Sequence, residues 1–165
     1  MTIKVGDKIP SVLLKVLGSD GLQDLSTDSV FAGKKVVLFS VPGAFTPVCS
    51  AQHLPGFVQH LPQFKAQGVE VACLAVNDPF VMKAWGEAHK AGGVTLLPDG
   101  NATFTKALGL EMDATAKGLG IRGQRFALYA ENGIVKSLAV EKPGAFEVSN
   151  AEAMLKTIGA AKAAA

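Results

Sequence analysis

The sequence predicts a single α/β domain over residues 1–165, with a mixed central sheet covered by helices on both faces. Residues 69–76 form a nearly continuous apolar run, which is typical of a strand buried in a parallel sheet. Residues 34–90 alternate as strand, helix, strand and helix, and such units cross over with a right hand. Asn132 and Gly133 separate two β-type runs, which predicts a tight antiparallel hairpin.

Glycine and proline divide the first part of the chain into short elements. Residues 12–17 predict a strand, and residues 18–21 predict the hairpin turn that follows it. Residues 34–41 are rich in β-branched and aromatic side chains and predict a central strand. Pro42 and Gly43 end that strand.

Residues 46–66 predict the helix that follows the central strand, but not a straight one. Pro55 and Pro62 each remove a backbone donor, so we expect the helix to be kinked or broken near 54–55 and again near 61–62.

The second half continues the alternation. Asp78 is the expected N-cap of the next helix, Pro79 its first residue, and the helix should run to about His89. The remaining expectations are a strand at 94–97, a helix at 101–108 ended by Gly109, an ordered loop at 110–124, strands at 125–130 and 134–140, and a last helix, capped by Ser149, that runs to about residue 158 and frays over 160–165.

The composition argues against several classes of function. The net charge of +2 has no basic cluster behind it, so neither nucleic acid nor an anionic membrane is expected as a partner. No apolar run approaches the roughly 18 residues that a membrane span needs. The first residues lack the apolar core of a signal peptide, which indicates a chain that is not secreted or is already processed. The cytoplasm is the expected compartment, or a plastid or mitochondrion if a transit peptide has been removed.

The cysteine content favours chemistry over structure. Cys49 and Cys73 are too few for a disulfide framework or a zinc site, and the three histidines do not complete a metal site. No phosphate-binding glycine loop is present. We therefore expect no cofactor and no metal, and a reducing compartment in which a conspicuous thiol is more often reactive than structural.

Cys49 follows the loop between the central strand and the helix, and so lies in the first turn of that helix. Free backbone N–H groups and the helix dipole favour an anion there, and a thiolate is such an anion. The alternative is an inert buried cysteine. Local sequence favours the reactive interpretation by about two to one.

The order of elements is β-α-β-α followed by β-β-α, with Cys49 at the end of the first central strand. This order is that of a thioredoxin-like fold. Thr46 stands where the first cysteine of a Cys-x-x-Cys pair would be, which weakens disulfide exchange as the primary role.

The motif Pro42-x-x-x-Thr46-x-x-Cys49 resembles the active-site signature of the peroxiredoxins. The longer run at 41–50, with residues 53–57 behind it, is similar to the type II subfamily. Residues 76–85 and 125–128 are similar to it as well. The resemblance spans roughly residues 4 to 158.

The resemblance implies a role for four residues. Cys49 matches the peroxidatic cysteine, and Thr46 matches the threonine whose hydroxyl contacts peroxide and thiolate. Pro42 matches the proline that shields the site, and Arg125 the arginine that pairs with the thiolate and the peroxide oxygens. Taken alone, Arg125 would be read as a surface arginine and Thr46 as an ordinary helix N-cap.

Cys73 has two interpretations that the sequence leaves about even. As a mid-strand residue in an apolar run it is typical of a small core side chain. By resemblance it matches the cysteine assigned as resolving partner in type II proteins. If Cys73 does not resolve the oxidised thiol, glutathione with glutaredoxin, or thioredoxin, must do so.

The resemblance also implies partners. The expected substrates are hydrogen peroxide and alkyl hydroperoxides, and Phe45 and Phe80, beside the site, match a homodimer contact.

His53 lies four residues after Cys49; a packing or solvent-exposed role is favoured over that of a general base by about four to one. The rival functions are a thioredoxin-like disulfide reductase and a peroxide-sensing redox relay or chaperone.

Overall fold

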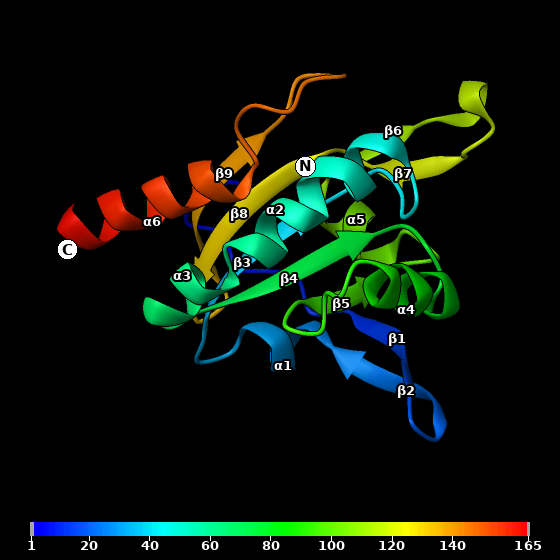
Figure 1. Ribbon diagram of the computed structural model, residues 1–165, viewed down its shortest axis with the longest axis horizontal. Coiled ribbons are helices and arrows are strands. Elements are labelled where there is room, and N and C mark those ends of the chain that lie inside the picture. The colour runs from blue at the N-terminus through cyan, green and yellow to red at the C-terminus, as the bar shows by residue number, and fades with distance from the viewer. Residues whose placement is uncertain (1, 165) are drawn as a thin grey trace.

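The computed structural model describes residues 2–164 and contains a five-stranded mixed sheet (Figure 1). The strand order is β5-β4-β3-β8-β9, in which β3, β4 and β5 are parallel and β3-β8 and β8-β9 are antiparallel. This is the mixed sheet of a thioredoxin-like α/β fold, as the sequence predicts. Its strands are β3 (Lys35–Ser40), β4 (Val69–Ala75), β5 (Thr95–Pro98), β8 (Phe126–Glu131) and β9 (Ile134–Val140).

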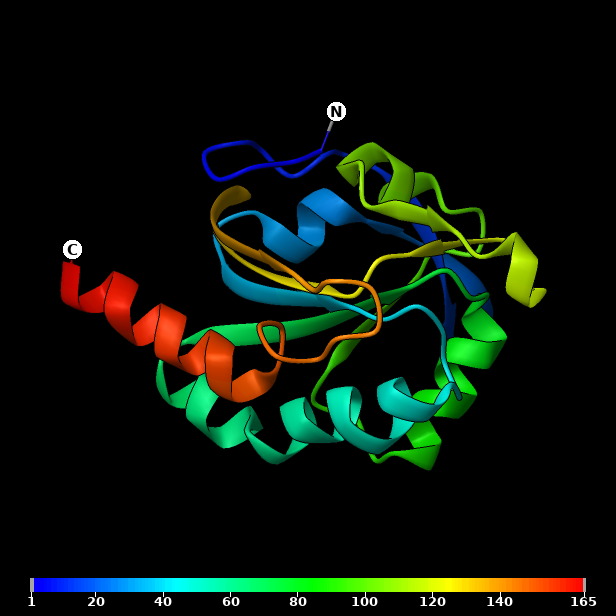
Figure 2. The same cartoon turned by 90° about the horizontal axis from the view of Figure 1, so that it is seen from above.

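Helices cover both faces of the sheet, which Figure 2 shows as a middle layer. One hydrophobic cluster joins the sheet to the helices that carry Phe57, Phe64, Trp85 and Met154. A second cluster lies on the opposite face. The helices of the first face are α2 (Leu54–Gln59), α3 (Leu61–Ala66), α4 (Pro79–Ala88) and α6 (Ala151–Ala164), and those of the second are α1 (Thr27–Phe31) and α5 (Thr103–Leu108).

The helix after β3 changes its winding where the sequence predicts a disturbance. Cys49–His53 forms a π-helical turn, η1, in which the Leu54 N–H donates to the Cys49 carbonyl. The turn widens just before Pro55, whose ring would collide with the carbonyl four residues earlier. A second break at His60 separates α2 from α3, next to Pro62. Both expected disturbances are therefore confirmed.

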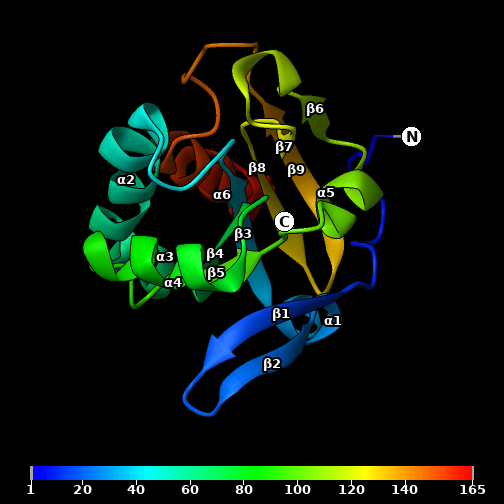
Figure 3. The same ribbon diagram turned by 90° about the vertical axis from the view of Figure 1, so that its right-hand side faces the viewer.

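Several local signals give the structures that they predict. Asp78 caps α4, since its Oδ1 accepts a hydrogen bond of 2.8 Å from the Val81 N–H. Asn132 and Gly133 both have positive φ, at 50° and 76°, as a tight hairpin turn requires. The first hairpin pairs β1 (Leu13–Gly18) with β2 (Gly21–Ser26) and lies below the sheet in Figure 3.

Other elements differ from expectation. The segment expected as a loop at 110–124 instead contains a small hairpin of β6 (Glu111–Asp113) and β7 (Ile121–Gly123), with the 3-10 turn η2 (Thr115–Lys117) between them. Asn150, not Ser149, caps α6: the Asn150 Oδ1 accepts from the Ala153 N–H at 2.8 Å. The Ser149 hydroxyl donates to Glu141 instead.

At the carboxyl end, α6 runs to Ala164, beyond the predicted end near residue 158. Residue 165, the last of the segment expected to fray, lies outside the described residues. Within residues 2–164, no helix combines the length and the apolar character that a membrane crossing needs.

Candidate active site

Cys49 lies where the sequence places it, in the first turn of the helix after β3. The helix begins at Pro47, and the Ser50 N–H donates to the Thr46 carbonyl at 3.0 Å. The Cys49 side chain is fully buried, and the cysteine is free. The first turn of a helix favours a negative charge nearby, because its dipole points its positive end there.

Arg125 directly precedes β8, the neighbour of β3 in the sheet, and its side chain reaches the thiol. Because β3 and β8 are antiparallel and Ser40 pairs with Phe126, the residue before β8 lies beside the loop that leaves β3. The Arg125 Nη2 donates to the Cys49 Sγ at 3.2 Å. A surface role for Arg125 is therefore wrong, and the arginine and the thiol meet as the resemblance implies.

His53 holds the other end of the same guanidinium. The Arg125 Nη1 lies 2.9 Å from the His53 Nδ1, and the His53 Nε2 lies 2.9 Å from the Ser149 carbonyl oxygen. Since Arg125 can only donate and a carbonyl can only accept, His53 must carry its proton on Nε2. Burial, together with the positive charge of Arg125, lowers the pKa of His53 from 6.5 to about 3.

The side chain of His53 therefore stays neutral and fully buried. A solvent-exposed role is ruled out. A general-base role finds no support, because the lone pair on Nδ1 is already occupied by Arg125. The buried packing role is borne out, and the ring also makes two hydrogen bonds, to Arg125 and Ser149, that the sequence did not indicate.

Thr46 and Pro42 lie in the same loop as Cys49. The Thr46 hydroxyl donates to the Gly43 carbonyl at 2.6 Å, so it does not cap the helix with its side chain as a simple N-cap would. The Pro42 carbonyl accepts a bond of 3.4 Å from Arg122, which also donates through Nε to Leu119. Sequence reasoning missed this brace, for which an isolated arginine in a glycine-rich segment gives no signal.

Gly43 leaves room for that brace. A Cβ atom at residue 43 would lie 2.8 Å from the Arg122 Nη1, so a larger residue would push the guanidinium away from the loop. The loop is further tied to the end of β4 by a bond of 2.9 Å from the Ala44 N–H to the Asn77 Oδ1. These contacts fix the backbone that carries Thr46 and Cys49.

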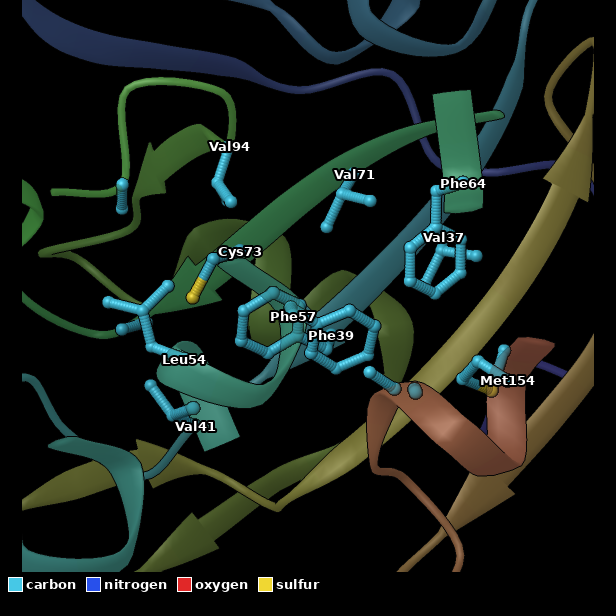
Figure 4. Packing of buried hydrophobic residues seen from close by; sticks show 14 of the residues in the cluster. Val37, Phe39, Val41, Leu54, Phe57, Phe64, Val71, Cys73, Val94 and Met154 are labelled. Atoms are coloured by element: carbon cyan, nitrogen blue, oxygen red, sulfur yellow. The ribbon is translucent and has the colours of Figure 1, made fainter. Parts of the chain in front are cut away.

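Cys73 lies in the middle of β4, paired with Phe39 of β3 and Leu96 of β5. Its sulfur points into the packed core beside Leu54 and Phe57 (Figure 4). Burial raises the pKa of the Cys73 thiol well above its ordinary value, and the nearby Cys49 raises it further. Both cysteines belong to one hydrophobic cluster, and both are free.

The groups around Cys49 set the chemistry that it can do. Among residues 2–164, no group of three or more histidine, cysteine or acidic side chains is arranged to hold a metal ion. A cavity of about 490 Å³ lies elsewhere, between β1, α4 and β5, and none of Thr46, Cys49 and Arg125 lines it. The chemistry available at Cys49 is thus that of a buried thiol with a cationic donor 3.2 Å away.

Comparison with known proteins gives the family. The Redoxin family model matches residues 4–155. Peroxiredoxin-2C of Oryza sativa subsp. japonica is 51% identical over 159 residues, which cover 94% of this chain and 98% of that protein. Peroxiredoxin-2D of Arabidopsis thaliana is 48% identical with the same coverage.

Solved structures agree with the sequence relatives. Reduced Prx3 of Vibrio vulnificus in complex with hydrogen peroxide has a TM-score of 0.91 and 51% identity, covering 95% of this chain and 99% of that one. Peroxiredoxin 5 of Alvinella pompejana has a TM-score of 0.85 and 35% identity, covering 96% and 99%. Matched over nearly its whole length in both sequence and structure, the chain belongs to the type II peroxiredoxins and is a thiol peroxidase that reduces peroxides.

Proposed function

We propose that Cys49 is the peroxidatic nucleophile for hydrogen peroxide and alkyl hydroperoxides, assisted by Arg125, Thr46 and Pro42. The observation that carries the proposal is the bond of 3.2 Å from the Arg125 Nη2 to the Cys49 Sγ, at the first turn of a helix. A guanidinium and helix N–H groups stabilise a thiolate, which is the form of cysteine that attacks an oxygen.

In the reaction, the Cys49 thiolate attacks the terminal oxygen of the hydroperoxide. A sulfur–oxygen bond forms and the oxygen–oxygen bond breaks, so sulfur is oxidised to a sulfenic acid and the peroxide is reduced. The leaving alkoxide or hydroxide takes up a proton and departs as alcohol or water. Donors from Arg125 stabilise the negative charge that develops on the leaving oxygen.

Thr46 has a distinct part in this proposal. Its hydroxyl already donates to the Gly43 carbonyl, but a hydroxyl keeps two acceptor lone pairs. Thr46 therefore accepts the O–H of the incoming peroxide and orients it toward the sulfur. Pro42 shields the pocket from bulk water on the loop side.

The rival function of a disulfide reductase lacks a residue that it needs. That chemistry typically uses two cysteines three positions apart, and Thr46 stands where the first of the pair would be. The other cysteine, Cys73, lies in the middle of β4. The peroxide-sensing relay or chaperone shares the first step and differs only in turnover.

The test is peroxide consumption with a thiol reductant. The Cys49→Ser variant should lose activity, while Cys73→Ser, a matched change in the same hydrophobic cluster, should keep the first oxidation step. Unchanged turnover in Cys49→Ser would overturn the proposal. Wild-type protein that is oxidised once but does not turn over with any added thiol would favour the sensing role.

For regeneration we propose an external thiol, supplied by glutathione with glutaredoxin or by thioredoxin. Cys73 is fully buried in β4, and the raised pKa of its thiol keeps it protonated at neutral pH, which makes it a poor nucleophile toward a sulfenic acid. A Cys49–Cys73 disulfide is the competing outcome. Mass spectrometry after one equivalent of peroxide decides between a sulfenate or glutathione adduct on Cys49 and an internal disulfide.

We also propose that the chain forms a homodimer through the face that carries Phe45 and Phe80. These two side chains are 56% and 59% exposed, and the Ala44–Asn77 hydrogen bond brings their segments together beside the site. Sedimentation of the Phe80→Lys variant should show a shift toward monomer.

The cytoplasm is the proposed compartment, with a plastid or mitochondrion as alternatives, and localisation of a tagged chain tests it.

A further inference from the structure

A buried carboxylate outside the described site organises the loop that lies behind Arg125. Glu141 follows the last residue of β9, and its side chain is only 7% exposed. Its two oxygens accept bonds of 2.8 to 2.9 Å from the backbone N–H groups of Glu147, Val148 and Ser149. The Ser149 hydroxyl adds a bond of 2.7 Å. We name residues 141–149 the Glu141 loop.

The Glu141 loop contacts His53 and Arg125 directly. The Ser149 carbonyl accepts from the His53 Nε2 at 2.9 Å. The ring of Phe146 lies with its centroid 4.9 Å from that of His53, and the Arg125 Cζ lies 5.8 Å from the Phe146 centroid. The loop therefore fixes both the ring of His53 and the face of the guanidinium.

The contacts connect Glu141 to Arg125 by two routes, one through the backbone and one through the loop and His53. Together we call these contacts the circuit. The Glu141 N–H donates to the Arg125 carbonyl at 2.9 Å, so the backbone of Arg125 is held by the same residue whose side chain gathers the loop. From the loop, the circuit passes through Ser149 and His53 to the guanidinium, and from there to the Cys49 sulfur.

We propose that Glu141 is a positioning residue for the peroxide reaction. By accepting bonds from the N–H groups of residues 147–149, it places the Ser149 carbonyl. That carbonyl fixes His53 with its proton on Nε2, which leaves Nδ1 to orient Arg125 toward Cys49. This inference rests on the proposed role of Arg125 at Cys49. The two are separable, because the position of the proton on His53 can be measured without any turnover.

The tautomer of His53 is what links the loop to the chemistry. An imidazole with its proton on Nδ1 would present a donor to a guanidinium that has only donors, and the two would repel each other. Burial and the charge of Arg125 keep His53 uncharged, with its pKa lowered to about 3. The neutral ring keeps one freedom, which is to carry its proton on either of its two nitrogens. The Ser149 carbonyl removes that freedom by accepting from Nε2.

The negative charge of Glu141 suits this task. Burial alone would raise the pKa of the carboxyl, but hydrogen bonds from Glu147, Ser149 and Val148 hold it below its ordinary value. A carboxylate can accept all four donors at once, whereas an amide must turn its NH₂ group toward at least one of them.

The experiment compares Glu141→Gln with a matched carboxylate on the same sheet. Glu131→Gln is the control, because Glu131 also accepts a side-chain bond, from the Tyr129 hydroxyl at 2.8 Å, but ends β8 at the far end from Arg125. For both variants we measure the circular dichroism spectrum, the rate of Cys49 oxidation by hydrogen peroxide, and the ¹⁵N shifts of the His53 ring.

We expect the folded Glu141→Gln protein to react with peroxide about tenfold more slowly, since a small misplacement of an orienting group has costs of this order or larger. Its His53 signals should change from a single Nε2–H tautomer to a mixture, and Glu131→Gln should match the wild type in both respects. A merely structural role would lower stability without moving the tautomer.

Three results would overturn the proposal. One is a folded Glu141→Gln variant with a peroxide rate within twofold of the wild type. The second is a slower variant whose His53 tautomer is unchanged. The third needs no variant and applies even if Glu141→Gln does not fold: wild-type His53 with its proton on Nδ1 excludes the circuit. Loss of activity in Cys49→Ser tests the proposed function separately.

Discussion

Cys49 and Cys73 are both fully buried, and both belong to the hydrophobic cluster on the same face of the sheet, yet their surroundings differ in kind. Cys49 lies in the first turn of a helix and accepts a bond from the Arg125 guanidinium at 3.2 Å. Cys73 lies in the middle of β4 among apolar side chains, where burial raises the pKa of its thiol.

The comparison teaches that burial by itself does not decide whether a cysteine is reactive. In an apolar strand, burial penalises the thiolate and leaves an inert thiol. At a helix N-terminus with a cation in contact, the same loss of water strengthens the attraction between the thiolate and its donors. One hydrophobic cluster thus contains both environments, and the Arg125 donor distinguishes the one around Cys49.

The largest expected effect is in selectivity of oxidation. With one equivalent of hydrogen peroxide, Cys49 should be oxidised at least about 1000-fold faster than Cys73, because only Cys49 has donors for the thiolate and for the leaving oxygen. Time-resolved mass spectrometry of the two cysteine peptides measures this, with Cys49→Ser giving the rate of Cys73 alone. Similar rates for the two thiols would break the comparison.

Removing the cation should move Cys49 toward the behaviour of Cys73. Arg125→Ala should slow the reaction with peroxide by about 100-fold, since it removes a donor to the reacting atoms. Arg122→Ala is the matched control: Arg122 bonds to the Pro42 carbonyl rather than to the sulfur, so its loss should cost less than about tenfold. Stopped-flow kinetics on folded variants gives both rates, and an Arg125→Ala rate within a few-fold of the wild type would contradict the prediction.

In stability, the order of the two cysteines should be reversed: substitution of Cys73 should have the larger effect. Cys73→Ser should lower the free energy of unfolding by about 1–3 kcal/mol, because its hydroxyl would be buried among apolar side chains without a partner. Cys49→Ser should cost less, since Arg125 can donate to the new hydroxyl. Urea denaturation of the two variants tests this, and an equal loss in both would show that the donors at Cys49 do not matter for a polar atom there.

The last prediction concerns the histidine behind the arginine. His53 has a pKa of about 3 in the folded protein and about 6.5 when unfolded, so between these values only the unfolded chain binds the proton. The free energy of unfolding should therefore fall as the pH drops below about 6.5, by up to roughly 1.4 kcal/mol per pH unit. Urea denaturation at pH 7, 6 and 5 should show a weaker slope in His53→Gln than in the wild type; parallel slopes would contradict the buried neutral form.

Much of the fold could be predicted from signals that lie within a few residues of each other. Asp78-Pro79 and Asn132-Gly133 act through their own backbone and side chains, so the helix start and the hairpin turn follow from two residues each. Pro55 and Pro62 likewise disturb the helix where they stand. The position of Cys49 in the first helical turn could be predicted for the same reason.

What the sequence could not supply depends on contacts between distant segments. The bond from Arg125 to Cys49 joins residues 76 positions apart, and only the pairing of β3 with β8 brings them together. Ser149 was expected to cap α6, but its hydroxyl is drawn to Glu141, and Asn150 next to it takes the capping role. A serine before a helix satisfies the capping rule locally, and nothing local reveals a competing buried carboxylate.

The widened turn at Cys49–His53 also restricts how the length of the chain can vary during evolution. A turn closed by a bond from residue 54 to residue 49 holds one residue more than an α-helical turn. Loss of a single residue between Cys49 and His53 would restore regular winding and rotate the thiol relative to the histidine that holds Arg125. Insertions and deletions should therefore be rare among functional relatives in this segment, whereas the β1–β2 turn, remote from the site, should tolerate them.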